Sequence, residues 1–404
     1  MVKLFKSLPF RLLIALIVGL IIGWLANEPV INVIQSIRHI TGQIIFFSVP
    51  LIVLGFVAPS IAKMGRNGSR LLGFSLIVVF LSVIGAAALS MVSGYIALPL
   101  LNIAETAEAR RALPEMLFQL NIPPIMPTMS AMALALMLGL AVAWTKSATF
   151  GKLLDEFHEI VLQLVKKIVL PIMPVFIATV FAPMAYDGRL TGQLPVFITV
   201  VLIIIVVQLL WVAILYVAAF LYTGKNPFEV IRHYGTPYLT AAGTMSSAAT
   251  LAVALEGANK SKVLNKDMVA FGLPLYAHIH MPGSIVTLIF LSMTVSQVFD
   301  GALPVLSVMI LYAILQVIFV IAAPGVPGGT IVASLGLIVA VLGFTDTQTG
   351  LMLTIFALTD SFGTATNICS DGPLAMILTK YAEKRGLAKV PNVSEPVNGS
   401  NGDN

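Results

Sequence analysis

Two carboxylates, Asp360 and Asp371, stand in an otherwise apolar stretch near the C-terminus. A charged side chain at membrane depth is tolerated only where it faces protein or a water-filled cavity, so such residues mark candidate functional sites. Their separation of eleven residues puts them about 20° apart on a helix, and Asn367 falls on the same face. Gly363 and Thr364 lie between them at neighbouring helical positions. The pattern predicts a polar stripe on a buried helix; the alternative is a pair of carboxylates at the ends of a shorter helix.

The composition is that of a polytopic membrane protein. Hydrophobic residues make up 58% of the 404 residues and charged residues only 10%, with a mean hydropathy of +0.99, whereas about a quarter of a soluble domain is charged. Because the lysines and arginines gather in short loops, the net charge of +5 indicates membrane topology and not a nucleic-acid partner. The single cysteine, Cys369, excludes an internal disulfide. No cofactor is predicted.

Six apolar segments occupy the first part of the chain. Each has the length needed to cross about 30 Å of hydrocarbon, and they run over residues 10–27, 41–62, 70–101, 126–145, 157–186 and 191–223. Basic residues recur in alternate loops, which puts the N-terminus and the loop after the sixth segment on the cytoplasmic side.

The rest of the chain departs from simple spans. Residues 233–259 have basic residues on both sides and a centre rich in small and polar residues, so we expect them to enter the membrane and return. Residues 268–298 then cross outward, and residues 303–345 form a second hairpin that is broken by prolines and glycines. Residues 350–382 cross back. The sequence thus predicts an all-α membrane protein with eight transmembrane helices and two re-entrant hairpins in inverted repeats, a pattern typical of transporters.

This topology implies three regions. Residues 1–223 would provide six helices, as a scaffold with part of a transport domain, and residues 224–384 would form the substrate and ion core. Residues 385–404 are expected to be a disordered cytoplasmic tail, since they are polar. We expect a multi-pass protein of the cell inner membrane with both termini in the cytoplasm.

Four motifs, in this order, resemble those of the dicarboxylate/amino acid:cation symporters, which are relatives of the glutamate transporters. They are the serine-rich run 246–250, IHMPGS at 279–284, the glycine-proline run 325–329 and DSFGTATNICSD at 360–371. The resemblance covers nearly the whole chain, and the last motif is most similar to the bacterial serine/threonine branch. It implies the glutamate-transporter-like fold, a homotrimer in the lipid bilayer and a small-molecule substrate.

The resemblance also assigns roles to residues. Asp360 would bind a substrate ammonium, Asn367 the substrate carboxylate, and Asp371 a sodium ion. The implied substrate-binding residues are Ser246, Ser247, Val326, Gly328, Asp360, Gly363, Thr364 and Asn367, and the implied sodium site consists of Asp371, Asn367, His280 and Met281. Gly363 stands where members with acidic substrates carry arginine, so the resemblance favours a small neutral amino acid such as serine, threonine or alanine. A dicarboxylate is the alternative.

The IHMPGS motif departs from the INMDGT that the family usually has. Pro282 replaces an aspartate that is a sodium ligand in the family, and His280 replaces an asparagine. Sodium prefers oxygen ligands, so imidazole is a poor replacement. His280 could instead carry a proton as the coupling ion; other interpretations are that His278 and His280 only pack, or that they bind a transition metal. The prediction is a symporter coupled to sodium, with proton coupling as the alternative.

Two other classes of protein fit the sequence less well. A channel needs rings of polar groups along a pore, whereas the polar groups here gather at one site. A zinc hydrolase needs a second histidine four residues after His158, and that position is Leu162. We therefore do not expect an enzyme.

Overall fold

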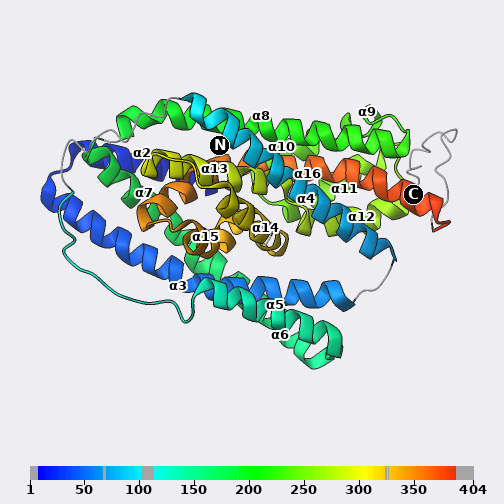
Figure 1. Ribbon diagram of the computed structural model, residues 1–404, viewed down its shortest axis with the longest axis horizontal. Helices are drawn as coiled ribbons and strands as arrows, with labels where there is room; N and C mark the ends of the chain where they lie inside the picture. The colour runs from blue at the N-terminus through cyan, green and yellow to red at the C-terminus, as the bar shows by residue number, and fades with distance from the viewer. Residues whose placement is uncertain are drawn as a thin grey trace, which may run out of the picture.

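A computed structural model describes residues 8–66, 70–101, 113–188, 190–323, 325 and 327–387. Within these ranges the chain is helical and contains no strand, and its helices run mostly along the long axis of the molecule (Figure 1). The first part contains α2 (Leu8–Leu25), α3 (Glu28–Arg66), α4 (Arg70–Ala97), α5 (Thr128–Thr145), α6 (Ala148–Leu164), α7 (Leu170–Tyr186) and α8 (Leu190–Thr223). A short 3₁₀ turn, η1 (Leu98–Leu101), follows α4, and a π turn, η2 (Val165–Val169), joins α6 to α7.

The second part is built from shorter helices and one long one. These are α9 (Phe228–Ile231), α10 (Gly235–Thr244), α11 (Ser247–Asn259), α12 (Lys266–Ile279), α13 (Pro282–Asp300), α14 (Leu306–Ala322), α15 (Gly329–Leu342) and α16 (Asp346–Lys384). Helices α10 and α11, which follow one another in the chain, pack against each other as a pair, and so do α14 and α15. The expected tail beyond residue 387 lies outside the described residues, as does Val326.

The helices have the composition of membrane spans. Among the described residues, five stretches are long and apolar enough to cross a membrane: Glu28–Ala62, Arg70–Leu101, Ala148–Tyr186, Val196–Thr223 and Lys266–Asp300. Shorter apolar helices lie at Phe10–Leu25, Ala133–Thr145, Leu306–Ala322 and Gly329–Leu342. The chain is therefore a helical, polytopic membrane protein, as its composition predicted.

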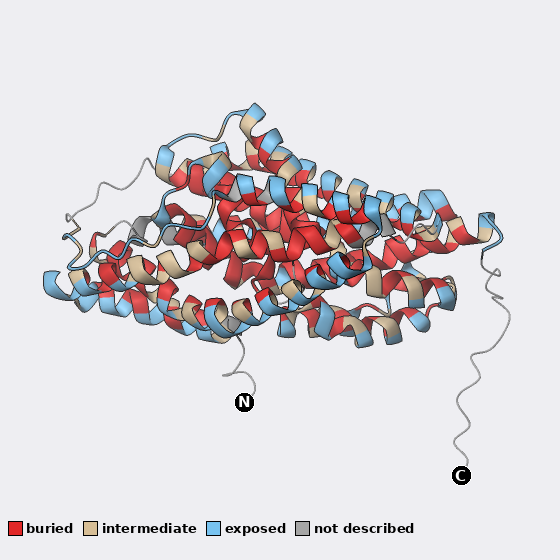
Figure 2. Cartoon of the chain, turned by 90° about the horizontal axis from the view of Figure 1, so that it is seen from below, coloured by how far each residue is buried: buried red, intermediate tan, exposed pale blue. Residues whose placement is uncertain are grey.

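The helices pack in two groups. In one group, α3 contacts α5, α6 and α7, and α2 contacts α7. In the other group, α13 and α16 contact each other, α4 and α8, and α16 also contacts α10 and α12. Residues buried within the protein concentrate along the middle of the molecule, and the outer helices expose apolar faces (Figure 2). The early helices α4 and α8 thus pack with the C-terminal half of the chain.

The polar stripe lies on α16, which is 39 residues long. A capping box at its start fixes where it begins: the Thr345 side chain accepts from Gln348 N–H, and the Gln348 side chain accepts from Thr345 N–H. Most of the helix is buried against its neighbours. It is not among the apolar spans because the buried side chains that it carries are in good part polar, which suits a helix surrounded by protein.

The expected span over residues 268–298 lies within the apolar stretch Lys266–Asp300, but it is interrupted, because α12 ends at Ile279 and α13 begins at Pro282. Two residues between α12 and α13 have non-helical backbone angles: His280 is extended, with φ of −103° and ψ of 95°, and Met281 has φ of −124° and ψ of 56°. The cause is Pro282, which lacks the N–H needed to continue α12 and instead begins α13, where no such bond is required. Both residues at the break are buried within the protein.

Candidate substrate and ion site

The turns of the two helix pairs meet at the candidate site. Between α10 and α11, Met245 adopts a left-handed conformation with φ of 50° and Ser246 caps α11. The Ser246 hydroxyl accepts a hydrogen bond from Ala249 N–H at 3.2 Å and donates one to the Gly325 carbonyl at 2.7 Å. This serine therefore closes the turn of one pair onto the turn of the other, 79 residues away.

Asp360 lies directly beneath the second turn. Gly328, whose φ of 69° suits a glycine, donates its backbone N–H to Asp360 Oδ2 at 2.9 Å. The carboxylate is 4% exposed, and among the described residues no basic side chain forms an ion pair with it. A buried carboxylate without a cationic partner is unfavourable, so the site is suited to a cationic group of a ligand.

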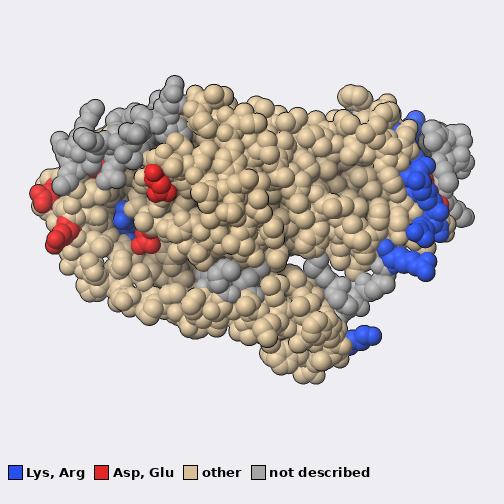
Figure 3. Space-filling view, viewed as in Figure 1, with Lys and Arg blue, Asp and Glu red and all other residues tan. Residues whose placement is uncertain are grey.

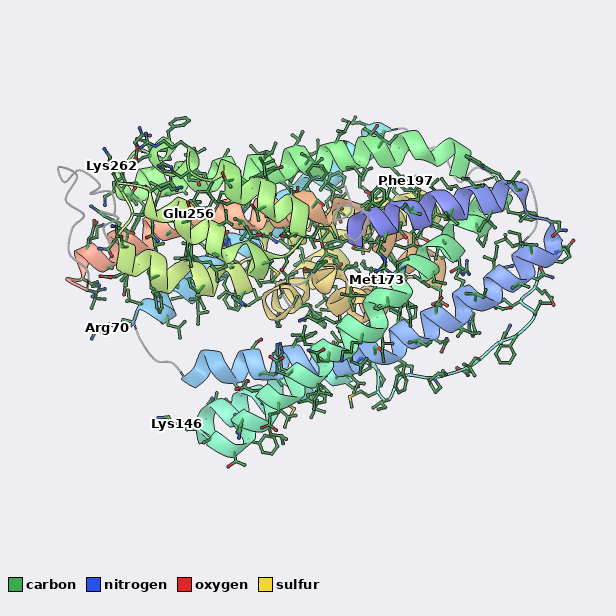
Figure 4. The ribbon with its side chains drawn as sticks, turned by 180° about the vertical axis from the view of Figure 1, so that it is seen from behind. Arg70, Lys146, Met173, Phe197, Glu256 and Lys262 are labelled. Atoms are coloured by element: carbon green, nitrogen blue, oxygen red, sulfur yellow. The ribbon has the colours of Figure 1, made fainter. Side chains whose placement is uncertain are left out.

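The turn over Asp360 lies well inside the molecule. An ideal Cβ atom on Gly328 would lie 3.7 Å from Cε of Met173, which lies near the middle of the long axis (Figure 4). Ser247 and Thr364 are buried in the same region, at the start of α11 and one turn after Asp360, and the Thr364 hydroxyl lies 3.5 Å from Asp360 Oδ1. Val326 lies outside the described residues.

Asn367 holds the start of α13. Its side-chain oxygen accepts from Gly283 N–H at 2.8 Å and from Ser284 N–H at 3.3 Å, and its amide donates to the Ser284 hydroxyl at 3.1 Å. The first N–H groups of a helix lack acceptors within the helix. The side-chain oxygen of Asn367, on α16, is the acceptor for two of them in α13. The start of α13 packs closely against α16, because a Cβ atom on Gly283 would come within 2.3 Å of the Gly363 carbonyl oxygen. Only glycine therefore fits at position 283.

His280, in the break between α12 and α13, contacts Asp371 of α16. His280 Nδ1 lies 2.9 Å from Asp371 Oδ1, and its Nε2 lies 2.8 Å from the Ser82 hydroxyl of α4. All three side chains are buried. Met281 beside them is buried too, and its sulfur lies 3.9 Å from the Thr330 hydroxyl at the start of α15. The four residues predicted for sodium thus converge on the break, since Asn367 holds its other end.

The two histidines separate in space. His278 is exposed, and its Nδ1 contacts the Pro274 carbonyl of its own helix at 2.7 Å, whereas His280 is buried. In the part of the chain that the structure describes, no three His, Cys, Asp or Glu residues form a metal-binding group. A transition-metal site formed by both histidines therefore has no support.

Two buried residues at this site escaped the sequence analysis, Ser82 of α4 and Gln208 of α8. Gln208 donates to the Gly283 carbonyl at 3.1 Å and to the Thr287 hydroxyl at 2.9 Å. Neither residue carries a sequence signal, because serine is common in membrane helices and the helices that hold them lie far from α13 in the chain.

The sequence is similar to those of known transport proteins. A family model described as the sodium:dicarboxylate symporter family matches residues 8–381. The chain is 26% identical over 165 residues to neutral amino acid transporter B(0) of Macaca fascicularis, covering 41% of this chain and 30% of that protein. It is 27% identical over 242 residues to excitatory amino acid transporter 2 of Mus musculus, covering 57% and 41%. The chain thus spans less than half the length of these relatives.

Proposed function

This chain belongs to the sodium:dicarboxylate symporter family, a family of transporters and not of enzymes, and we propose that it is a symporter for a small neutral amino acid. In this proposal a sodium gradient drives uptake of serine, threonine or alanine by alternating access. The observation that carries the substrate class is the buried Asp360 carboxylate, which has no basic partner among the described residues and lies under a turn that can donate N–H groups.

An amino acid has the groups that this site lacks. Its ammonium would pair with Asp360, and its carboxylate would receive hydrogen bonds from Ser247 and from the backbone N–H groups at the starts of α11 and α15. Ser246 would donate to the same carboxylate once its hydroxyl releases the Gly325 carbonyl. Asn367 and Thr364 would add polar contacts along α16, and Val326 and Gly328 would cover the substrate. Gly363 supplies no charge for a second carboxylate, so aspartate and dicarboxylates should bind weakly.

The proposed sodium site is the break between α12 and α13. Asp371 and Asn367 would provide oxygen ligands, with the backbone carbonyl of Met281, and His280 would lie beside the ion. Because Pro282 and His280 replace two residues of the family motif, we expect fewer sodium ions per transport cycle than in the relatives with acidic substrates. The cation is transported and is not a resident cofactor.

The proposed topology has eight transmembrane helices, with α10–α11 and α14–α15 as the two re-entrant hairpins. Most of the lysines and arginines visible on one face gather at one end of the long axis, and Arg70, Lys146 and Lys262 lie toward that end (Figures 3 and 4). Under the positive-inside rule this end faces the cytoplasm. We propose that both chain termini are on the cytoplasmic side as well. In this topology, residues 1–223 would form the scaffold with part of the transport domain. Residues 224–384 would form the substrate and ion core, and residues 385–404 the cytoplasmic tail.

We further propose that the protein forms a homotrimer in the cell inner membrane, as the family resemblance implies. A thermal-shift screen of the purified protein with amino acids and dicarboxylates, with and without sodium and at two pH values, tests the site. Stabilisation by serine that requires sodium supports the proposal, whereas stabilisation by succinate alone contradicts it. Stabilisation by serine that depends on pH and not on sodium would favour a proton as the coupling ion.

A further inference from the structure

Gln208 of α8 is the buried amide next to the candidate site. It is 1% exposed, and its Nε2 donates to the Gly283 carbonyl at 3.1 Å and to the Thr287 hydroxyl at 2.9 Å. An amide nitrogen has two hydrogens, so both are used within the protein. Since Asn367 holds the N–H of the same residue, Gly283 is fixed at both its N–H and its carbonyl.

The other half of this amide is unpaired. Among the described residues, Gln208 Oε1 is buried and has no hydrogen-bond partner. Rotating the amide by 180° would not help, because Oε1 would then face the Gly283 carbonyl oxygen, which is also an acceptor. An unpaired buried acceptor is destabilising, and in a native protein it calls for a donor that the chain itself does not supply.

The position of Gln208 points to the substrate as that donor. An ideal Cβ atom on Gly363 would lie 3.6 Å from Gln208 Nε2, so no side chain of α16 separates this amide from the helix at that point. Gly363 is three residues after Asp360 and therefore lies about one turn along the same face. A substrate whose ammonium binds Asp360 has its side chain within reach of this region.

We propose that Gln208 is a specificity-determining residue whose Oε1 accepts a hydrogen bond from the side-chain hydroxyl of a small amino acid such as serine. The inference rests on the proposed function and narrows it to hydroxylated substrates. The neutral oxygen Oε1 can accept a hydrogen bond from the hydroxyl of serine. The methyl group of alanine would leave this oxygen unpaired, and the carboxylate of an acidic side chain would be repelled by it. Sites built to bind a hydroxyl reject analogues that lack it.

Calorimetric titration of the purified protein with L-serine and L-alanine in sodium tests the proposal. Gln208→Leu keeps the approximate size and removes Oε1, so serine affinity should fall about tenfold while alanine affinity changes little. Thr287→Val is the matched control, because it removes a partner of Nε2 and leaves Oε1 in place; its ratio of serine to alanine affinity should equal that of the unmodified protein. Equal losses of serine and alanine affinity in Gln208→Leu would overturn the proposal, since the amide would then only hold α13.

A second variant keeps the test decisive if Gln208→Leu does not fold. The methyl group of Gly363→Ala would lie about 3.6 Å from Gln208 Nε2, between the amide and α16, where it should keep a substrate hydroxyl away from the amide and lower the serine-to-alanine ratio. An unchanged ratio in this variant would overturn the inference alone. If the unmodified protein binds neither amino acid, the proposed function itself fails.

Discussion

His280 Nδ1 lies 2.9 Å from Asp371 Oδ1, inside the protein and beside the break between α12 and α13. The other ring nitrogen contacts the Ser82 hydroxyl at 2.8 Å. The carboxylate assigned to sodium by family resemblance therefore already has a protein partner in this structure. A cation that binds Asp371 must share the carboxylate with His280 or displace the imidazole, so the number of coupled ions becomes the first property to measure.

We expect the double substitution His280→Asn with Pro282→Asp to add a sodium ion to the transport cycle. The two changes restore the oxygen ligands of the family motif, and aspartate is well tolerated in the first turn of a helix. The logarithm of serine affinity should then depend on the logarithm of sodium concentration with a slope steeper by about one. Equal slopes for the variant and the unmodified protein would show that the motif does not set the number of ions.

Asp360→Asn should weaken substrate binding much more than folding. The change keeps the shape of the side chain and its hydrogen bond to Gly328 N–H, but removes the charge that would pair with the substrate ammonium. A hydrogen bond to a charged group contributes about 1.5–3 kcal/mol, so serine affinity should fall about tenfold to a hundredfold. The control is Asp267→Asn at an exposed position of α12, which should bind serine normally. Unchanged affinity in a stable Asp360→Asn protein would remove Asp360 from the substrate site.

Ser246→Ala should loosen the contact between the two hairpin turns. It removes the hydrogen bond to the Gly325 carbonyl and the cap of α11, and loss of such a cap costs about 1 kcal/mol. A cysteine introduced at Ala248, with Cys369 replaced by alanine, should react faster with a thiol reagent in this variant. Thr240→Ala is the control, since among the described residues the Thr240 hydroxyl donates to the Thr236 carbonyl of its own helix and to no group of the other hairpin. Equal labelling rates in the two variants would mean that Ser246 does not hold the turns together.

Asn367→Ala should destabilise the protein, because Gly283 N–H and Ser284 N–H would lose their acceptor in a buried place. Leaving buried groups unpaired costs about 1–3 kcal/mol. Asn367→Asp keeps the acceptor and adds a negative charge at a helix N-terminus, which is favourable. Thermal unfolding in detergent should therefore show a lower melting temperature for Asn367→Ala than for Asn367→Asp. The reverse order would argue against the capping role.

The stripe on α16 could be predicted from the sequence because its physical basis is local. Asp360, Asn367 and Asp371 stand at spacings that repeat with the helix, in a segment too apolar to carry charge without a reason. The turns of the two hairpins were visible for a similar reason, as small and helix-breaking residues within apolar runs. The pairing of His280 with Asp371 could not be predicted, since it depends on the angle at which α12 meets α16.

Other parts of the site depend on packing between distant segments. Ser82 and Gln208 reach it from α4 and α8, and nothing in their neighbouring residues distinguishes them from other polar side chains in membrane helices. The break after α12 did have a signal, because Pro282 cannot continue a helix, but a proline is also tolerated inside the spans α3 and α7. The outcome at Pro282 depends on Asn367, which supplies the acceptor that the start of α13 needs.

The most direct test of the proposed function is uptake of labelled serine by the purified protein in proteoliposomes, with an inward sodium gradient. We expect accumulation that stops when the sodium gradient is collapsed, that threonine inhibits and alanine inhibits less strongly, and that succinate and aspartate leave nearly unchanged. Accumulation that succinate inhibits best would contradict the assignment of Asp360 to a substrate ammonium. Accumulation that follows the proton gradient alone would contradict sodium coupling, and serine movement that follows neither gradient would contradict symport itself.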